Sequence, residues 1–108
     1  MIKQFKLKDM AGGWFVGDFA PAALDTSAVE VAVQHFKAGE HSTAHHHKIA
    51  TEVTLLLSGL AVMAGRTLEP GDIVTLPPGV SSSFEAISDC VTVVVKHPGV
   101  LNDKYIDE

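Results

Sequence analysis

Short runs of Val, Ile, Leu, Thr and Phe recur along the chain between Gly and Pro residues, whereas the three-to-four-residue spacing of an amphipathic helix is hard to find. Residues 29–34 alternate Val with Glu, Ala and Gln. A strand with this pattern should turn its apolar face inward and its other face toward water or a neighbouring subunit. Further apolar runs at 51–57, 60–63, 73–76 and 90–96 also resemble strands. We therefore expect an all-β fold of about eight to ten strands.

Turn residues separate these runs. Ser58-Gly59 and Gly65-Arg66 follow two of them and predict successive hairpins. Pro70-Gly71 and Pro77-Pro78-Gly79 bracket the run at 73–76, because Pro fixes φ and Gly accepts positive φ. Such a succession is typical of a β-sandwich or a β-barrel, and periodicity alone does not separate the two.

The remaining segments bear on domain organisation. Residues 11–26 show no clear period, so we expect loops or an irregular edge strand there. Neither a linker nor a repeat divides the chain, which predicts one domain over residues 1–108 with its barrel core at about 28–97.

Composition and charge narrow the class of protein. With 46% apolar and 19% charged residues in 108, the chain matches an ordinary globular protein, and its apolar runs are too short to span a bilayer. The first eight residues mix Lys with apolar residues, unlike a signal peptide, and Cys90 is the single cysteine, so a cytoplasmic location is expected. The net charge of −5 and the scattered lysines disfavour nucleic acid as a partner.

Three potential metal ligands lie close together in the sequence. His45 and His47 lie on one face of an extended strand because side chains alternate, whereas His46 points away. Glu52 begins the next strand and can return a carboxylate to the same ion. Two imidazoles and one carboxylate suit a divalent Fe, Mn, Ni or Zn ion and leave positions open for water or substrate.

This cluster resembles the first cupin motif, Gly-x5-His-x-His-x3or4-Glu-x6-Gly. Every defined position is matched, by Gly39, His45, His47, Glu52 and Gly59. The second motif, Gly-x5-Pro-x-Gly-x2-His-x3-Asn, is matched in its first half by Gly71, Pro77 and Gly79. The chain is therefore similar to small single-domain cupins of bacterial type. The resemblance implies a cupin double-stranded β-helix, which is a jelly-roll barrel, and a metal ion on His45, His47 and Glu52.

The second motif then departs from the family pattern. Ser82 stands where the family places a metal-binding His, and Ala86 stands at the usual Asn position. Three interpretations follow: a three-ligand site with an extra open position, recruitment of another side chain such as His41, or a barrel that has lost its metal. Ser82 and His41 are therefore further candidate pocket residues. Alternation disfavours Glu85 as a ligand, because it should point away from the side of Ser82.

The resemblance leaves the function open between classes. We expect a metal-dependent enzyme of the dioxygenase or isomerase/epimerase type that acts on a small polar molecule, such as a sugar or organic acid. The alternative is a non-catalytic module that binds a small ligand or metal and acts through a partner. A third reading is a dimerising scaffold with a relic site. Small cupins are commonly dimers, so a homodimer is expected in each case.

Overall fold

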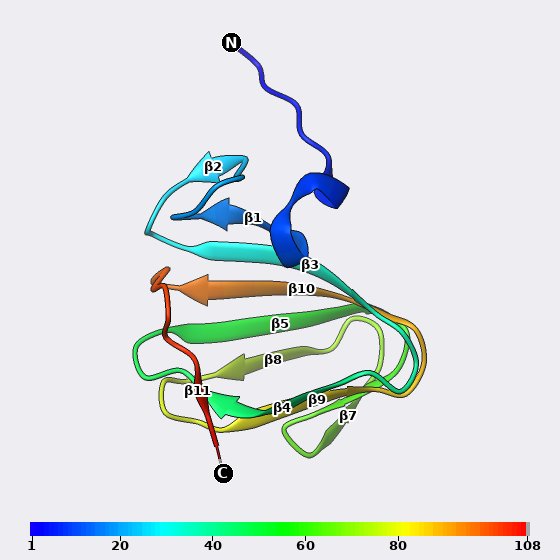
Figure 1. Cartoon of the computed structure of the whole chain (residues 1–108). Coiled ribbons are helices and arrows are strands. Elements are labelled where there is room, and N and C mark those ends of the chain that lie inside the picture. The colour runs from blue at the N-terminus through cyan, green and yellow to red at the C-terminus, as the bar shows by residue number, and fades with distance from the viewer. Residues whose placement is uncertain (108) are drawn as a thin grey trace.

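The computed structural model describes residues 1–107 and is built from two sheets whose strands are antiparallel except for one pair (Figure 1). The six-stranded sheet contains, in spatial order, β2 (Leu24–Asp25), β1 (Trp14–Gly17), β3 (Glu30–Phe36), β10 (Cys90–His97), β5 (Thr51–Ser58) and β8 (Ile73–Leu76), with β1 and β2 paired in parallel. The five-stranded sheet contains β11 (Tyr105–Ile106), β4 (His41–His46), β9 (Ser82–Ala86), β6 (Ala61–Met63) and β7 (Arg66–Leu68). The expected all-β fold is confirmed.

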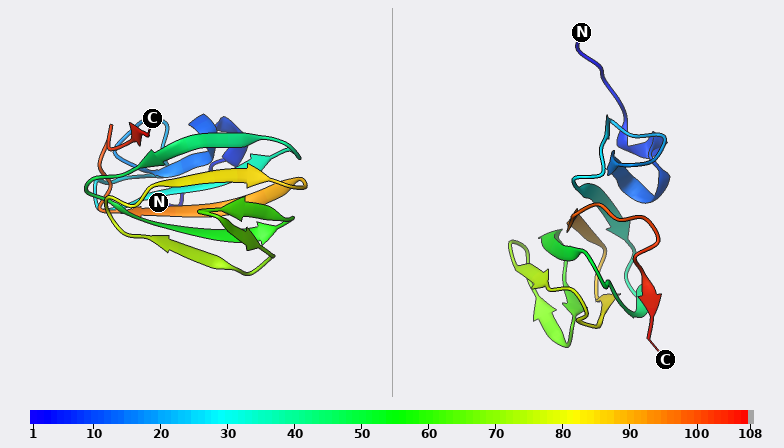
Figure 2. Two further views of the ribbon diagram at one scale, coloured as in Figure 1. Left: turned by 90° about the horizontal axis from the view of Figure 1, so that it is seen from below. Right: turned by 90° about the vertical axis from the view of Figure 1, so that its left-hand side faces the viewer.

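The chain crosses repeatedly between the two sheets. Strands β3, β5, β8 and β10 lie in the larger sheet, and β4, β6, β7 and β9 lie in the smaller one. Figure 2 shows the two layers edge-on, with the chain wound around the space between them. This winding is that of a double-stranded β-helix, in which neighbours in a sheet are distant in sequence.

One of the two predicted hairpins is wrong. Strands β6 and β7 do pair as a hairpin around Gly65, but β5 pairs with β10 and β8, and β6 lies in the other sheet. Gly59 explains the difference. It has φ +88°, and a Cβ there would lie 2.1 Å from the carbonyl oxygen of Asp89. The chain therefore passes tightly against a neighbouring backbone and changes sheets instead of reversing.

The N-terminal region is irregular, as expected for residues 11–26. Two 3₁₀ turns, η1 (Leu7–Asp9) and η2 (Ala11–Gly13), precede the short edge strands β1 and β2. Within residues 1–107, no helix has the length and apolarity needed to cross a membrane.

One end of the barrel interior is a conventional apolar core. Its buried residues are Leu56, Ala61, Met63, Leu68, Leu76, Phe84, Ala86 and Cys90. Phe36 packs on Phe84 with ring centroids 4.7 Å apart. Cys90 is 2% exposed within this cluster, which is the environment of an inert thiol. This end supplies apolar burial, so the opposite end is free to carry polar groups.

The opposite end of the interior is polar, and the orientation expected for β3 is wrong there. Glu30 and Ala32 are 6% and 0% exposed and face inward, whereas Val31 and Val33 face outward and are part-exposed. Strand β10 also alternates, and its residues Thr92 and Val94 are buried and face the interior. Alternation shows that two faces differ but not which one faces the interior. Here the inner face contributes the buried polar residues Glu30 and Thr92, and the face with the valines lies outside.

Candidate metal centre

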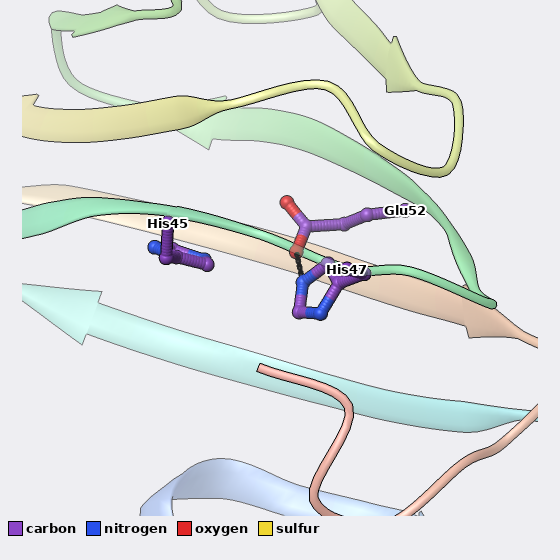
Figure 3. Close-up of side chains that lie close together, drawn as sticks. All are labelled: His45, His47 and Glu52. Atoms are coloured by element: carbon purple, nitrogen blue, oxygen red, sulfur yellow. Dashed lines mark hydrogen bonds and ion pairs between the residues drawn. The ribbon is translucent and has the colours of Figure 1, made fainter. Parts of the chain in front are cut away.

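The structure brings His45, His47 and Glu52 together at the polar end of the barrel (Figure 3). One potential ligand atom from each residue lies within 4.8 Å of the other two. Nε2 of His47 is 3.2 Å from Oε1 of Glu52. The two imidazole rings meet edge to face, with centroids 5.4 Å apart. These side chains thus converge on a point, as ligands of a single ion must.

A β-bulge in β4 aims the two histidines inward. His41 pairs with Glu85 and Ser42 with Phe84, but the register then shifts so that His45 pairs with Ser82. The shift inserts one extra residue between Ser42 and His45, so both of these residues line the interior despite their odd spacing. Without the bulge, alternation from Ser42 would turn His46 inward, in place of His45 and His47 on either side of it.

Each of the two candidate histidine ligands donates its Nδ1 proton to a backbone carbonyl. Nδ1 of His45 lies 2.9 Å from the carbonyl oxygen of Thr43, and Nδ1 of His47 lies 2.5 Å from that of Asp103. A carbonyl only accepts hydrogen bonds, so Nδ1 carries the proton in both rings. The Nε2 atoms are therefore the ones available to a metal ion.

Asp103 also fixes the turn that separates the ligands. Its carboxylate accepts hydrogen bonds from the backbone N–H groups of Lys48, Ile49 and Ala50, at 2.9, 3.1 and 2.9 Å. Burial acts to raise the pKa of Asp103, but these three hydrogen bonds outweigh it and the pKa is lowered. The carboxylate stays ionised and holds the segment between His47 and Glu52.

Glu52 and His47 lie in contact inside the barrel, with Nε2 3.2 Å from Oε1, and they form an ion pair when His47 is protonated. Burial is the largest influence on Glu52 and acts to raise its pKa, but hydrogen bonds from His47 and from the Thr54 hydroxyl, at 3.1 Å, help to lower it overall. The hydrogen bond to Glu52 raises the pKa of His47, and burial opposes this. The proton on Nε2 occupies the lone pair that a metal would use, so proton and metal compete for this site.

The two further candidate pocket residues have different placements. Ser82 is 6% exposed and faces His45 across the β4–β9 pair, at the edge of the cavity. His41 is exposed and pairs with Glu85 on the outer face, because the bulge lies between it and His45. The structure therefore does not bring His41 to the ligand group. Glu85 is also exposed, as alternation along β9 predicts.

The ligand group opens into a cavity of about 1210 Å³. Its walls include His45, Glu52 and Ser82, together with Lys96 and Glu30 from the larger sheet. The register places Lys96 beside Glu52 on one neighbouring strand and Glu30 on the other. The site is thus part of the wall of an open pocket, lined by both polar and apolar side chains, that is large enough for a small molecule.

Sequence reasoning missed three residues that shape this site. Thr54 could have been found, because it follows Glu52 by two residues and so shares its face. Lys96 ends a run of valines that gives no sign of which face is inner. Asp103 lies far from the ligands in sequence, and no spacing rule connects it to them.

Comparisons with known proteins identify the fold. No family model matches the chain, and no curated protein matches it. A solved structure from Klebsiella pneumoniae, an uncharacterized conserved protein with a double-stranded beta-helix domain, is 26% identical over 80% of each chain, with a TM-score of 0.68. A cupin-2 domain containing protein from Shewanella frigidimarina is 19% identical over 68% of this chain and 74% of that chain, with a TM-score of 0.58.

A larger solved protein contains the same architecture. The DMSP lyase DddQ from Ruegeria pomeroyi is 20% identical over 86% of this chain, with a TM-score of 0.71, and this chain covers 49% of it. These likenesses agree with the alternation of the chain between two sheets. The chain therefore folds as a double-stranded β-helix of the cupin type.

Proposed function

We propose that the chain binds one divalent Fe, Mn, Ni or Zn ion through His45, His47 and Glu52. We further propose that it is a metal-dependent enzyme acting on a small polar molecule such as a sugar or organic acid. The observation that carries the proposal is the convergence of three ligand atoms within 4.8 Å at the wall of a cavity of about 1210 Å³. A closed structural site would not need that cavity.

The residues present fit such an ion. Two imidazoles and a carboxylate are a donor set for Fe(II), Mn(II), Ni(II) or Zn(II). Both Nδ1 atoms are engaged by carbonyls, and the lowered pKa of Glu52 keeps its carboxylate ionised. Ser82 stands opposite His45, where the cupin motif has a histidine, so a coordination position remains for water or substrate. Three protein ligands with open positions are typical of catalytic sites.

The chain's own groups prepare the site for chemistry. A bound divalent ion would supply Lewis-acid polarisation of a substrate oxygen. Thr54 holds one oxygen of Glu52, and Asp103 holds the His47 ring in a single tautomer. These contacts fix the ligand geometry before substrate arrives. A dioxygenase or an isomerase/epimerase would use the same arrangement, and the metal that the protein retains would separate these classes.

Metal content tests the first part of the proposal. Tag-free protein purified without chelators should carry nearly one ion per chain by mass spectrometry, and His45→Ala/His47→Ala should carry almost none. His41→Ala is the matched control, because His41 is on the same strand but faces outward. It should retain the ion. A wild-type protein that carries no metal and takes up none on titration would contradict the proposal.

Turnover separates an enzyme from a binding module. The retained metal directs a screen of small sugars and organic acids. Product formation that is lost in His47→Ala supports the enzyme. Thermal stabilisation by a compound that is never consumed favours the non-catalytic module that acts through a partner.

A further inference from the structure

Lys96 projects from β10 into the interior of the barrel. It lies on the inner face of that strand with Thr92 and Val94, in register with Glu30 on one side and Glu52 on the other. Its side chain is partly exposed and stands between two strands that carry carboxylates. Within residues 1–107, however, neither carboxylate lies within ion-pair distance of its ammonium group. The charge of Lys96 is therefore not accounted for by an ion pair with either carboxylate.

The ammonium group rests on an aromatic ring and keeps its donors free. Nζ of Lys96 lies 4.8 Å from the centroid of the Trp14 ring. This cation–π contact restricts the side chain but uses none of the three N–H donors. Lys96 and Trp14 both line the cavity that contains His45 and Glu52. The donors are therefore directed to a space that a ligand can enter.

The charge of the cavity favours an anion once a metal is bound. Its ionisable lining residues are Lys8, Lys96, Lys104, Glu30, Glu52 and Asp103, with its histidines taken as neutral. Three positive and three negative formal charges cancel, so a divalent ion leaves the cavity at +2. The chain as a whole has a net charge of −5. A positive interior in a negative protein concentrates and holds small anions.

We propose that Lys96 forms an anion subsite beside the metal position and that the substrate is a small carboxylate-bearing molecule. The carboxylate accepts hydrogen bonds from the Lys96 ammonium, while another oxygen of the same molecule is directed toward the ligand group. This inference rests on the proposed function, because it places the substrate next to the ion. Arg66, the chain's single arginine, does not line the cavity, so the bidentate fork that often recognises phosphate is missing there.

The competing role for Lys96 is that of a counter-ion. Its charge also acts to lower the pKa of Glu52 and of His47, although hydrogen bonding and burial act more strongly on both residues. A pure counter-ion would influence how the site holds metal. It would not make the cavity distinguish an anion from a neutral molecule of the same shape, and this difference defines the test.

The experiment measures binding of glycolate and of neutral glycolamide to metal-loaded protein by calorimetry. Wild type should prefer glycolate, because both the bound ion and Lys96 attract its charge. Lys96→Met should lower this preference by about tenfold, the effect of one charge-assisted hydrogen bond, and Lys96→Arg should keep most of it. Lys37→Met is the control, because Lys37 is exposed and does not line the cavity. Metal content and the unfolding temperature are measured for every variant.

Each result bears on one proposal. Equal metal content with a glycolate preference that falls only in Lys96→Met supports the subsite. An undiminished preference in Lys96→Met, or wild type that does not prefer glycolate, overturns the subsite and leaves the metal site standing. Metal content is a separate measurement. If it shows that wild type takes up no metal, the proposed function on which the subsite rests is overturned.

Discussion

The backbone carbonyl of Asp103 accepts the Nδ1 proton of His47, and the carboxylate of the same residue holds the turn between His47 and Glu52. One residue of the C-terminal tail therefore fixes both the tautomer of one candidate ligand and the spacing of two candidate ligands. Asp103 itself is not in the candidate ligand group. The tail beyond residue 97 is consequently part of the site, although the sequence pattern places the barrel core at about 28–97.

Asp103→Asn should weaken metal affinity by about tenfold, the usual effect of losing a partner that orients a ligand. The amide loses the negative charge that the three N–H groups surround. Competition with a chromophoric chelator measures the change. Asp72→Asn is the control, because Asp72 also accepts a backbone hydrogen bond, from Glu69 at 2.8 Å, but does not line the cavity. Unchanged affinity in Asp103→Asn would show that the hold of this carboxylate on the turn between His47 and Glu52 does not contribute to metal binding.

The sequence pattern was sufficient to group the candidate ligands and to orient β9. Period-two alternation correctly placed Ser82 inward and Glu85 outward, because β9 is regular over that stretch. The pairing of His45 with His47 also follows from spacing. Their inward direction depends on the bulge before His45, and the local composition does not predict that bulge.

The remaining features depend on contacts between distant segments. The inner face of β3 carries Glu30 rather than valines, because other buried polar residues, such as Glu52 and Thr92, lie on that side of the sheet. Lys96 becomes a cavity residue only when β10 pairs between β3 and β5. Both facts are properties of the assembled barrel, so a scan along one strand cannot supply them.

Metal affinity should depend on pH through His47. Its hydrogen bond to Glu52 raises its pKa above 6.5 in the metal-free protein, so the imidazole is protonated below that raised pKa. Binding of the ion must then release this proton. Affinity should fall by at least about tenfold per pH unit below the raised pKa and vary little above it. Calorimetry in buffers of different ionisation enthalpy measures the proton release. An affinity that does not change with pH would contradict the ion pair.

The same pair predicts how the stability of the metal-free protein varies with pH. The raised pKa of His47 stabilises the fold fully below pH 6.5, and this contribution is lost as pH rises through the folded-state pKa. The lowered pKa of Glu52 stabilises the fold above pH 4.5, and this contribution is lost as pH falls through its folded-state pKa. Chelator-treated protein should therefore unfold at the highest temperature between those values. In His47→Gln, the unfolding temperature should no longer decline as pH rises above this range. If the decline persists in this variant, groups other than His47 cause it.

Thr92→Val should stabilise the protein. Thr92 is 1% exposed, and its hydroxyl has no hydrogen-bond partner among residues 1–107. Replacing an unpaired buried hydroxyl by a methyl group should add about 1 kcal/mol, or a rise of about 4–8 °C in Tm. Thr54→Val is the matched control and should lower Tm, because its hydroxyl donates to Glu52. A lower Tm in Thr92→Val would show that bound water satisfies this hydroxyl.

The outer face of the larger sheet should pair two copies of the chain. Val33, Val93, Leu55 and Ile73 stand in one row across β3, β10, β5 and β8, and Ile73 is 63% exposed. The neighbouring outward positions of these strands include Val31, Val95 and Val53. Such an uncharged sheet face is best covered by an equally uncharged surface, and a two-fold axis lets the face meet itself.

Val93→Lys tests this pairing, because it sets a lysine against its own copy near the centre of the contact. Light scattering coupled to size exclusion should give twice the chain mass of 11.5 kDa for wild type and the single mass for Val93→Lys. Thr67→Lys, on β7 of the other sheet, is the control and should remain dimeric. Because Val93 points out of the barrel, the variant should keep its metal and its fold. A monomeric wild type, or a Val93→Lys protein that remains dimeric, would rule out this face as the homodimer interface.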